Sequence, residues 1–204
     1  MRVLVGAYRK LDYLPRCIES LREHVSGVSD VVFIDDSGDA ETHAWERERG
    51  TVVDVGGRGY GAAMSALCEA ADGREAFVLE EDFSFRYSVD LNEMSEILRH
   101  RPYLAQVALL RGPHFPIEHE HGGLIEALEA KGHKFTDVQG VLEHTATFTC
   151  NPSVWRGSVF ESGWPQCQWS EDAKRDELLR EGYRFGFLPG VRVAHDGIRS
   201  GKGY

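Results

Sequence analysis

The sequence predicts a single α/β domain in which helices flank a mostly parallel central sheet. Short β-branched runs alternate with helical segments through the first half of the chain. Acidic or glycine-rich stretches follow three of these runs. The 204 residues are enough for one domain with a substantial core. Strands that alternate with helices favour a parallel, doubly wound sheet.

The first half of the chain supplies the most regular elements. One expected helix carries Leu14, Ile18, Leu21 and Val25 on a single face. The following polar helix is expected to stop at Gly50. In chain order we expect strand 2–7, helix 12–25, strand 30–36, helix 37–50, strand 51–55, a glycine turn and helix over 56–71, and strand 75–82.

The second half is less regular. We expect helix 90–100, strand 103–110, a loop over 111–123, helix 124–132, strand 145–150, helix 170–182, strands within 183–195 and a glycine-rich tail to residue 204. The whole chain, 1–204, is then one domain, with a nucleotide-binding half (1–110) and an acceptor-side half (111–204).

Composition disfavours several classes of function. The net charge is −10 and no long Lys/Arg cluster is present, so nucleic acid is not expected as the main ligand. No apolar run approaches the ~20 residues of a transmembrane helix. The four cysteines are scattered, without a CxxC pair, which argues against a structural zinc cluster and favours a cytoplasmic location.

The acids after the strands suggest a metal and nucleotide site. Asp35 and Asp36 close the second strand, the turn 57–61 follows the third, and Glu80 and Asp82 close the fourth. Ligands of parallel sheets bind at the carboxyl ends of the strands, so these features would converge on one crevice. A divalent cation would let such an acidic crevice hold a diphosphate. On an extended strand the side chains of Glu80 and Asp82 point the same way.

Each feature also has an ordinary explanation. Acids at strand ends are commonly solvated, and Asp35 to Gly38 could form a turn and helix cap. The turn places Gly57, Gly59 and Gly61 two residues apart, which is not the dinucleotide-binding spacing. The evidence therefore lies in the combination of features.

The ordered set of motifs resembles the GT-A fold glycosyltransferases, most closely glycosyltransferase family 2. The opening VLVGAYRKLDYLPRCIESL is similar to the family's first strand and helix. VVFIDDSGD resembles its nucleotide-binding strand end, and FVLEEDF resembles the strand with its acid-x-acid metal motif. WSEDAKRDELLREGYRFGFLPGVRVAH is similar to its Glu-Asp helix and final histidine. The resemblance implies a Rossmann-like, GT-A-type domain.

The resemblance also implies roles for individual residues. Asp35 or Asp36 would hold the nucleoside. Asp82 would be the principal metal ligand, with Glu80 where the family often has an aspartate, and His195 would be a further ligand of the metal or diphosphate. We expect the nucleotide-sugar donor to contact Asp35, Asp36 and the turn residues Gly57, Arg58 and Gly59. Asp172, with Glu171 beside it, would be the general base, although Ser170 followed by acids is also a common helix start.

The implied activity is inverting, metal-dependent glycosyl transfer. The donor would be a nucleotide sugar, UDP- or GDP-linked, bound with Mn²⁺ or Mg²⁺. The acceptor could be a protein, a glycan or a small molecule. Two alternatives stay open: a nucleotidyltransferase on a related fold, and a non-catalytic module that binds a sugar nucleotide or glycan.

Three further features lie outside these motifs. The histidines His114, His119 and His121 are expected in a loop over the acceptor site more than in a metal site. Of the tryptophans, Trp155 is expected in the core, while Trp164 and Trp169 could be core or sugar-stacking residues. In the tail, Arg199 and Lys202 could fold over the diphosphate or belong to a frayed end.

Overall fold

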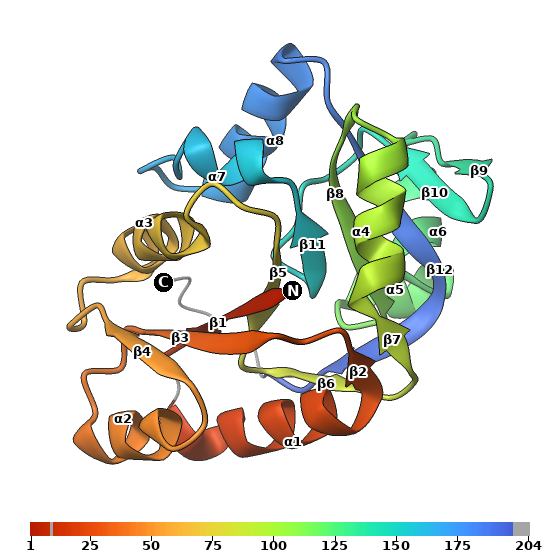
Figure 1. Cartoon of the computed structure of the whole chain (residues 1–204). Helices are drawn as coiled ribbons and strands as arrows, with labels where there is room; N and C mark the ends of the chain where they lie inside the picture. Colours follow the sequence, from red (N-terminus) through yellow and green to blue (C-terminus); the bar gives the residue numbers. More distant parts are fainter. Residues whose placement is uncertain (9, 198–204) are drawn as a thin grey trace.

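The computed structural model describes residues 1–8 and 10–197. Within those residues, ten strands form one sheet in the order β4-β3-β1-β5-β11-β8-β12-β10-β9, with β6 paired to β12 (Figure 1). The mixed α/β domain with flanking helices confirms the fold class expected from the sequence.

The first half of the chain builds the parallel part of the sheet. Four strands pair in parallel, in the spatial order β4-β3-β1-β5. These are β1 (Arg2–Ala7), β3 (Asp30–Asp35), β4 (Thr51–Asp54) and β5 (Ala76–Glu80). The connections between them are η1 (Lys10–Asp12), α1 (Leu14–His24), α2 (Ala40–Arg47) and α3 (Tyr60–Ala71). The carboxyl ends of these parallel strands therefore lie at one edge of the sheet.

The second half adds shorter and antiparallel strands. Its strands are β6 (Phe83–Phe85), β8 (Leu104–Arg111), β9 (Thr136–Val138), β10 (Val141–His144), β11 (Ser153–Trp155) and β12 (Arg184–His195), and β2 (Val25–Ser26) pairs with β7 (Val89–Asp90) in a small second sheet. Its helices are α4 (Leu91–His100), α5 (Pro116–His121), α6 (Leu124–Ala130), α7 (Gly157–Glu161) and α8 (Ser170–Arg180). β11 pairs antiparallel with both β5 and β8, and it thus joins the two halves.

Helices cover both faces of the sheet. The apolar faces of α1 and α4 pack on one side, where Leu14, Leu21 and Met94 are buried. On the other side α3, α7 and α8 pack around Trp155, whose exposure of 0% confirms its expected core position. The sheet is therefore packed between two apolar cores, one on each face.

The expected strand 145–150 is wrong as secondary structure. In this segment Ala146, Phe148 and Cys150 are buried at every second position, as in a strand. Its backbone, however, bonds to side chains in place of a neighbouring strand. The amide of Thr149 donates to the Gln106 side chain at 3.2 Å, and the amide of Cys150 donates to Glu171 at 3.0 Å. The strands that do pair in the sheet here are β10, which precedes the segment, and β11, which follows it.

Two smaller expectations are also corrected. The stretch 111–123, expected as a loop, contains the short helix α5, which begins at Pro116 where a proline is tolerated. The expected pair of strands in 183–195 is one strand, β12, with register shifts along its pairing with β8. In the described part of the chain, no helix is both long and apolar enough to cross a membrane.

Candidate active site

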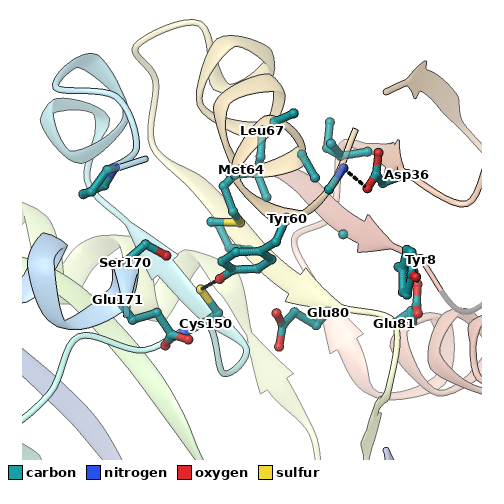
Figure 2. Close-up of a pocket in the computed structure, with 18 of the residues that line it drawn as sticks. Tyr8, Asp36, Tyr60, Met64, Leu67, Glu80, Glu81, Cys150, Ser170 and Glu171 are labelled. Atoms are coloured by element: carbon teal, nitrogen blue, oxygen red, sulfur yellow. Dashed lines mark hydrogen bonds between the residues drawn. The ribbon is translucent and has the colours of Figure 1, made fainter. Parts of the chain in front are cut away.

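A cleft of about 1070 Å³ lies at the carboxyl ends of the parallel strands and is lined by residues from both halves of the chain. The cleft brings together most of the residues singled out in the sequence. Those that line it are Asp36, Arg58, Gly59, Glu80, Asp82, Glu171, Asp172 and His195. Asp35 and Gly57 do not line it. Figure 2 shows Glu80 and Glu171 on either side of Tyr60, with Asp36 at the far end.

Asp36 holds the glycine turn in place. Its two carboxylate oxygens accept hydrogen bonds from the backbone amides of Arg58 and Gly59, both at 2.7 Å. Gly59 has a φ of 90° and precedes the first residue of α3, so it adopts a backbone conformation that glycine allows. The carboxylate and the turn therefore form one rigid wall at the amino end of α3.

The three consecutive acids at the end of β5, Glu80, Glu81 and Asp82, do not all point the same way. The side chain of Glu81 accepts a hydrogen bond from the backbone amide of Tyr8, and Glu81 is buried. Asp82 instead lies beside His195, with 3.2 Å between Asp82 Oδ2 and His195 Nε2. Figure 2 shows Glu80 directed toward Tyr60 and away from Glu81.

The pair Asp82 and His195 fits a divalent cation. Asp82 Oδ1 and His195 Nδ1 are buried, and neither has a hydrogen-bond partner within residues 1–8 and 10–197. The imidazole is fixed by stacking on Phe83, with ring centroids 4.6 Å apart. A side chain at Gly197 would collide with Asp82 Oδ2, so only glycine leaves this carboxylate its place. Carboxylate oxygen and imidazole nitrogen are suitable ligands for Mn²⁺, and Glu80 adds a second carboxylate to the same cleft.

Glu171 lies in the first turn of α8 and points into the cleft. Its Oε2 accepts the hydrogen bond from the amide of Cys150. Burial raises the pKa of Glu171, and the charge of Asp172 adds to that shift. Beside it, Cys150 Sγ and Tyr60 Oη lie 3.3 Å apart, and burial raises the pKa of both groups. Cys150 is therefore a neutral thiol and Tyr60 a neutral phenol at neutral pH.

Asp172 lines the cleft but is more exposed. Its side chain is 59% exposed, and its Oδ1 lies 2.7 Å from Arg175 Nη1, one helical turn further along α8. An exposed ion pair of this kind is worth under about 1 kcal/mol, so the carboxylate can turn toward a ligand at little cost. Asp172 lies in the first turn of α8, at the positive end of the helix dipole.

A second cavity of about 690 Å³ adjoins the cleft. Glu80, Cys150, Glu171 and His195 line both cavities. These four residues therefore lie where a ligand in one cavity would meet a ligand in the other.

A buried ion pair forms part of the wall of this second cavity. Arg111 at the end of β8 donates two hydrogen bonds to Glu118 of α5, at 2.6 and 2.8 Å. Burial raises the pKa of Glu118, but hydrogen bonds from Arg111 and from the amides of His114 and Phe115 outweigh it and lower the pKa to about 2. The segment expected as a loop over the acceptor site is thus tied to the sheet at its beginning.

Sequence reasoning missed or left open some residues of the cleft. Tyr8 and Cys150 line the cleft without any motif that could have indicated them. His114 packs against His195, with ring centroids 4.0 Å apart, and the stretch rich in Pro and His was the available signal. Trp164 is buried, whereas Trp169 is 69% exposed and lines the cleft.

Other expected residues lie elsewhere. Asp35 is fully buried behind the strand end and contacts His43. His119 and His121 are exposed on α5 and line neither cavity. Arg199 and Lys202 lie outside the described residues.

Comparisons with known proteins agree with this architecture. Residues 2–154 match the family model described as glycosyl transferase family 2. The crystal structure of S. aureus TarS 1–349 aligns with a TM-score of 0.64 and 13% identity, covering 95% of this chain and 59% of that one. The same protein in complex with UDP-GlcNAc aligns with a TM-score of 0.66 and 13% identity, covering 100% and 61%. This chain thus spans about three fifths of the length of the solved chains it matches. No curated protein sequence matches it significantly.

Proposed function

Because the chain belongs to glycosyl transferase family 2, we propose that it is an inverting, metal-dependent glycosyltransferase. In this proposal it moves a sugar from a nucleotide-sugar donor to an acceptor hydroxyl. The carrying observation is that Asp36, Asp82, Asp172 and His195, far apart in the sequence, line a single cleft.

The first-half wall of the cleft suits the nucleotide. The turn fixed by Asp36 and the amino end of α3 form a confined polar surface for the base and ribose. A solved structure of TarS 1–349 contains UDP and another contains UDP-GlcNAc, which supports a uridine nucleotide sugar as the donor here.

Asp82, His195 and Glu80 would hold the divalent cation, Mn²⁺ or Mg²⁺. When bound, the cation stabilises the negative charge of the departing diphosphate as a Lewis acid. The facing atoms of this pair, Asp82 Oδ2 and His195 Nε2, would provide ligand atoms, and Asp82 Oδ1 would be a further one. His195 is already oriented by its stacking on Phe83.

Asp172 takes the proton from the acceptor hydroxyl in this proposal. It lines the cleft in the first turn of α8, where a carboxylate can act as a general base. Glu171 acts on the geometry through its bond to the amide of Cys150, which fixes α8 against the 145–150 segment. Attack by the acceptor on the face opposite the diphosphate inverts the anomeric centre.

The acceptor would enter through the second cavity. This cavity meets the cleft at Glu80 and Glu171, beside the place where the donor sugar would lie. The acceptor would be a protein, a glycan or a small molecule. We also propose that the protein acts in the cytoplasm.

The proposal is tested by titrating UDP- and GDP-sugars into the protein with and without Mn²⁺ by calorimetry. We expect wild-type binding to depend on Mn²⁺ and Asp82→Ala to weaken it at least ~100-fold, because the main carboxylate ligand is lost. Asp176→Ala, an exposed acid on α8 outside the cleft, is the matched control and should bind as the wild type does.

The products decide between the open alternatives. Release of a nucleoside diphosphate with the sugar transferred supports a glycosyltransferase. Release of pyrophosphate would indicate nucleotidyl transfer, and donor binding without turnover against any acceptor would indicate a binding module. Unchanged donor affinity in Asp82→Ala would remove this residue from the metal site.

A further inference from the structure

A second group of ligand-type side chains lies behind the strand end that carries Asp36. Asp35, His43 and Glu46 each offer one ligand atom, and these atoms lie within 4.8 Å of one another. Asp35 ends β3, while His43 and Glu46 are one turn apart on the same face of α2. Their exposures are 0%, 6% and 0%. These three side chains line neither the cleft nor the second cavity.

Three of the four carboxylate oxygens of this group lack a hydrogen-bond partner among the described residues. Asp35 Oδ2 and both oxygens of Glu46 are buried, and no residue in the described part of the chain forms a hydrogen bond with them. Within residues 1–8 and 10–197, neither carboxylate forms an ion pair with a lysine or arginine. Buried carboxylates in this state need a proton or a cation close by.

The imidazole is arranged as a metal ligand would be. His43 Nε2 faces Asp35 Oδ1 at 2.9 Å, and on the other side His43 Nδ1 lies 3.8 Å from Asp54 Oδ2. Histidines that bind metals commonly donate a hydrogen bond from their other ring nitrogen to a carboxylate, and Asp54 lies near that nitrogen at a distance longer than a hydrogen bond. Asp35 Oδ1 also accepts bonds from the amide and hydroxyl of Ser37, at 2.8 and 2.7 Å, which fix its orientation.

We propose that Asp35, His43 and Glu46 form a Zn²⁺ site that is separate from the metal site of the cleft. One imidazole and two carboxylates leave a fourth tetrahedral position for water. The ion would join α2 to the end of β3, directly next to Asp36, and would thus stabilise the wall that holds the glycine turn. The proposal does not depend on the activity of the enzyme.

The competing explanation is a proton shared between the two carboxyl groups. Burial and the charge of Asp35 raise the pKa of Glu46 to about 9, so without a cation Glu46 would carry a proton at neutral pH. The two explanations differ in one measurable respect, since only the first retains metal.

The experiment uses the full chain with Asp82→Ala, which removes the cleft ligand. The protein is stripped with a chelator, loaded with Zn²⁺ or Co²⁺ without nucleotide, freed of excess metal and assayed by mass spectrometry of the metal and by Co²⁺ absorption. We expect about one metal per chain. Adding Glu46→Gln should weaken metal affinity at least ~10-fold, whereas Glu41→Gln, an exposed acid on the same helix, should leave it unchanged.

Loss of all metal from Asp82→Ala would overturn the proposal, and so would equal affinity in Glu46→Gln. If Glu46→Gln fails to fold, Asp54→Asn takes its place, because Asp54 is 53% exposed and its replacement keeps the core intact. We expect Asp54→Asn to weaken metal binding several-fold through His43. Unchanged affinity in that variant would contradict the proposed ligand geometry.

Discussion

The two walls of the cleft are fixed by different kinds of bond. On the first-half wall, the acids follow parallel strands whose positions are set by regular ladders, and Asp36 bonds to the backbone amides of Arg58 and Gly59. On the second-half wall, the 145–150 segment pairs with none of the described strands and is fixed by the side chains of Gln106 and Glu171. The first wall therefore follows from the fold, whereas the second depends on a few side chains.

This difference has a functional consequence. The wall that would bind the nucleotide is shared with any protein of this sheet topology, because strand ends converge by geometry. The wall that would meet the acceptor can be rebuilt by exchanging single side chains without altering the sheet. We expect substitutions on the second wall to change transfer more than donor binding.

The largest effect is expected from Asp172→Asn. The variant should bind donor as the wild type does and lose about 10²- to 10⁴-fold in kcat, because an amide cannot take the acceptor proton. Glu171→Gln should lose far less, since glutamine can still accept the hydrogen bond from Cys150. Steady-state kinetics with matched donor titrations measure both.

The reverse result would exchange the two roles. A Glu171→Gln variant without turnover, together with a nearly normal Asp172→Asn, would make Glu171 the base. Its raised pKa and its position between the two cavities would then explain the choice.

The second prediction concerns the support of the 145–150 segment. Gln106 is buried, and its amide group bonds to Thr149 and, at 2.9 Å, to Ser153 Oγ. Gln106→Leu should lower the free energy of unfolding by about 2 kcal/mol, since it leaves the half-buried backbone groups of Thr149 without their side-chain partner. Urea denaturation measures this loss, and donor affinity should stay within about twofold if the first wall is independent of it. A parallel loss of donor affinity would show that the two walls are coupled.

The third prediction concerns Asp36, which fixes the glycine turn of the first wall as Gln106 fixes the 145–150 segment of the second. Asp36→Asn keeps one oxygen for the glycine turn and turns an amide donor toward the other backbone N–H. We expect a loss of about 2 kcal/mol in stability and weaker donor binding, measured by thermal unfolding and calorimetry. The control is Ser29→Ala, at an exposed position before β3 and outside the cleft. Full donor affinity in Asp36→Asn would separate the turn from the nucleotide site.

The same contrast explains how much could be predicted from the sequence. The parallel strands and their helices follow from alternation of burial and periodicity, which are local properties. The convergence of Asp36 and Asp82 on one cleft follows from strand parallelism. The different orientations of Asp35 and Asp36 follow from the alternation of side chains along an extended chain, although the sequence alone did not show which of the two faces the cleft.

The second wall could not be derived in this way. The 145–150 segment has the apolar alternation of a strand, and only the tertiary contact with Gln106 shows that its hydrogen bonds go to a side chain. Cys150 and Tyr60 meet across 90 positions of sequence, and no local pattern indicates such a pair. Long-range contacts between irregular segments carry no periodic signal.

The smallest effect concerns pH and the core of the second half. His144 on β10 is buried, stacks on Phe187 with ring centroids 4.7 Å apart, and has a pKa lowered by burial to about 3. The unfolded chain, with an ordinary histidine pKa near 6.5, binds a proton more readily, so stability is full above about 6.5 and falls as the pH falls toward 3. Between pH 7 and pH 5.5 the wild type should lose about 1 kcal/mol from this group. His144→Phe keeps a ring that can stack on Phe187 but cannot titrate. Urea denaturation at the two pH values should therefore show a smaller change in the free energy of unfolding for this variant than for the wild type, by about 1 kcal/mol. An unchanged difference would mean that His144 reaches water in the folded protein and that the second half is less tightly packed than the first.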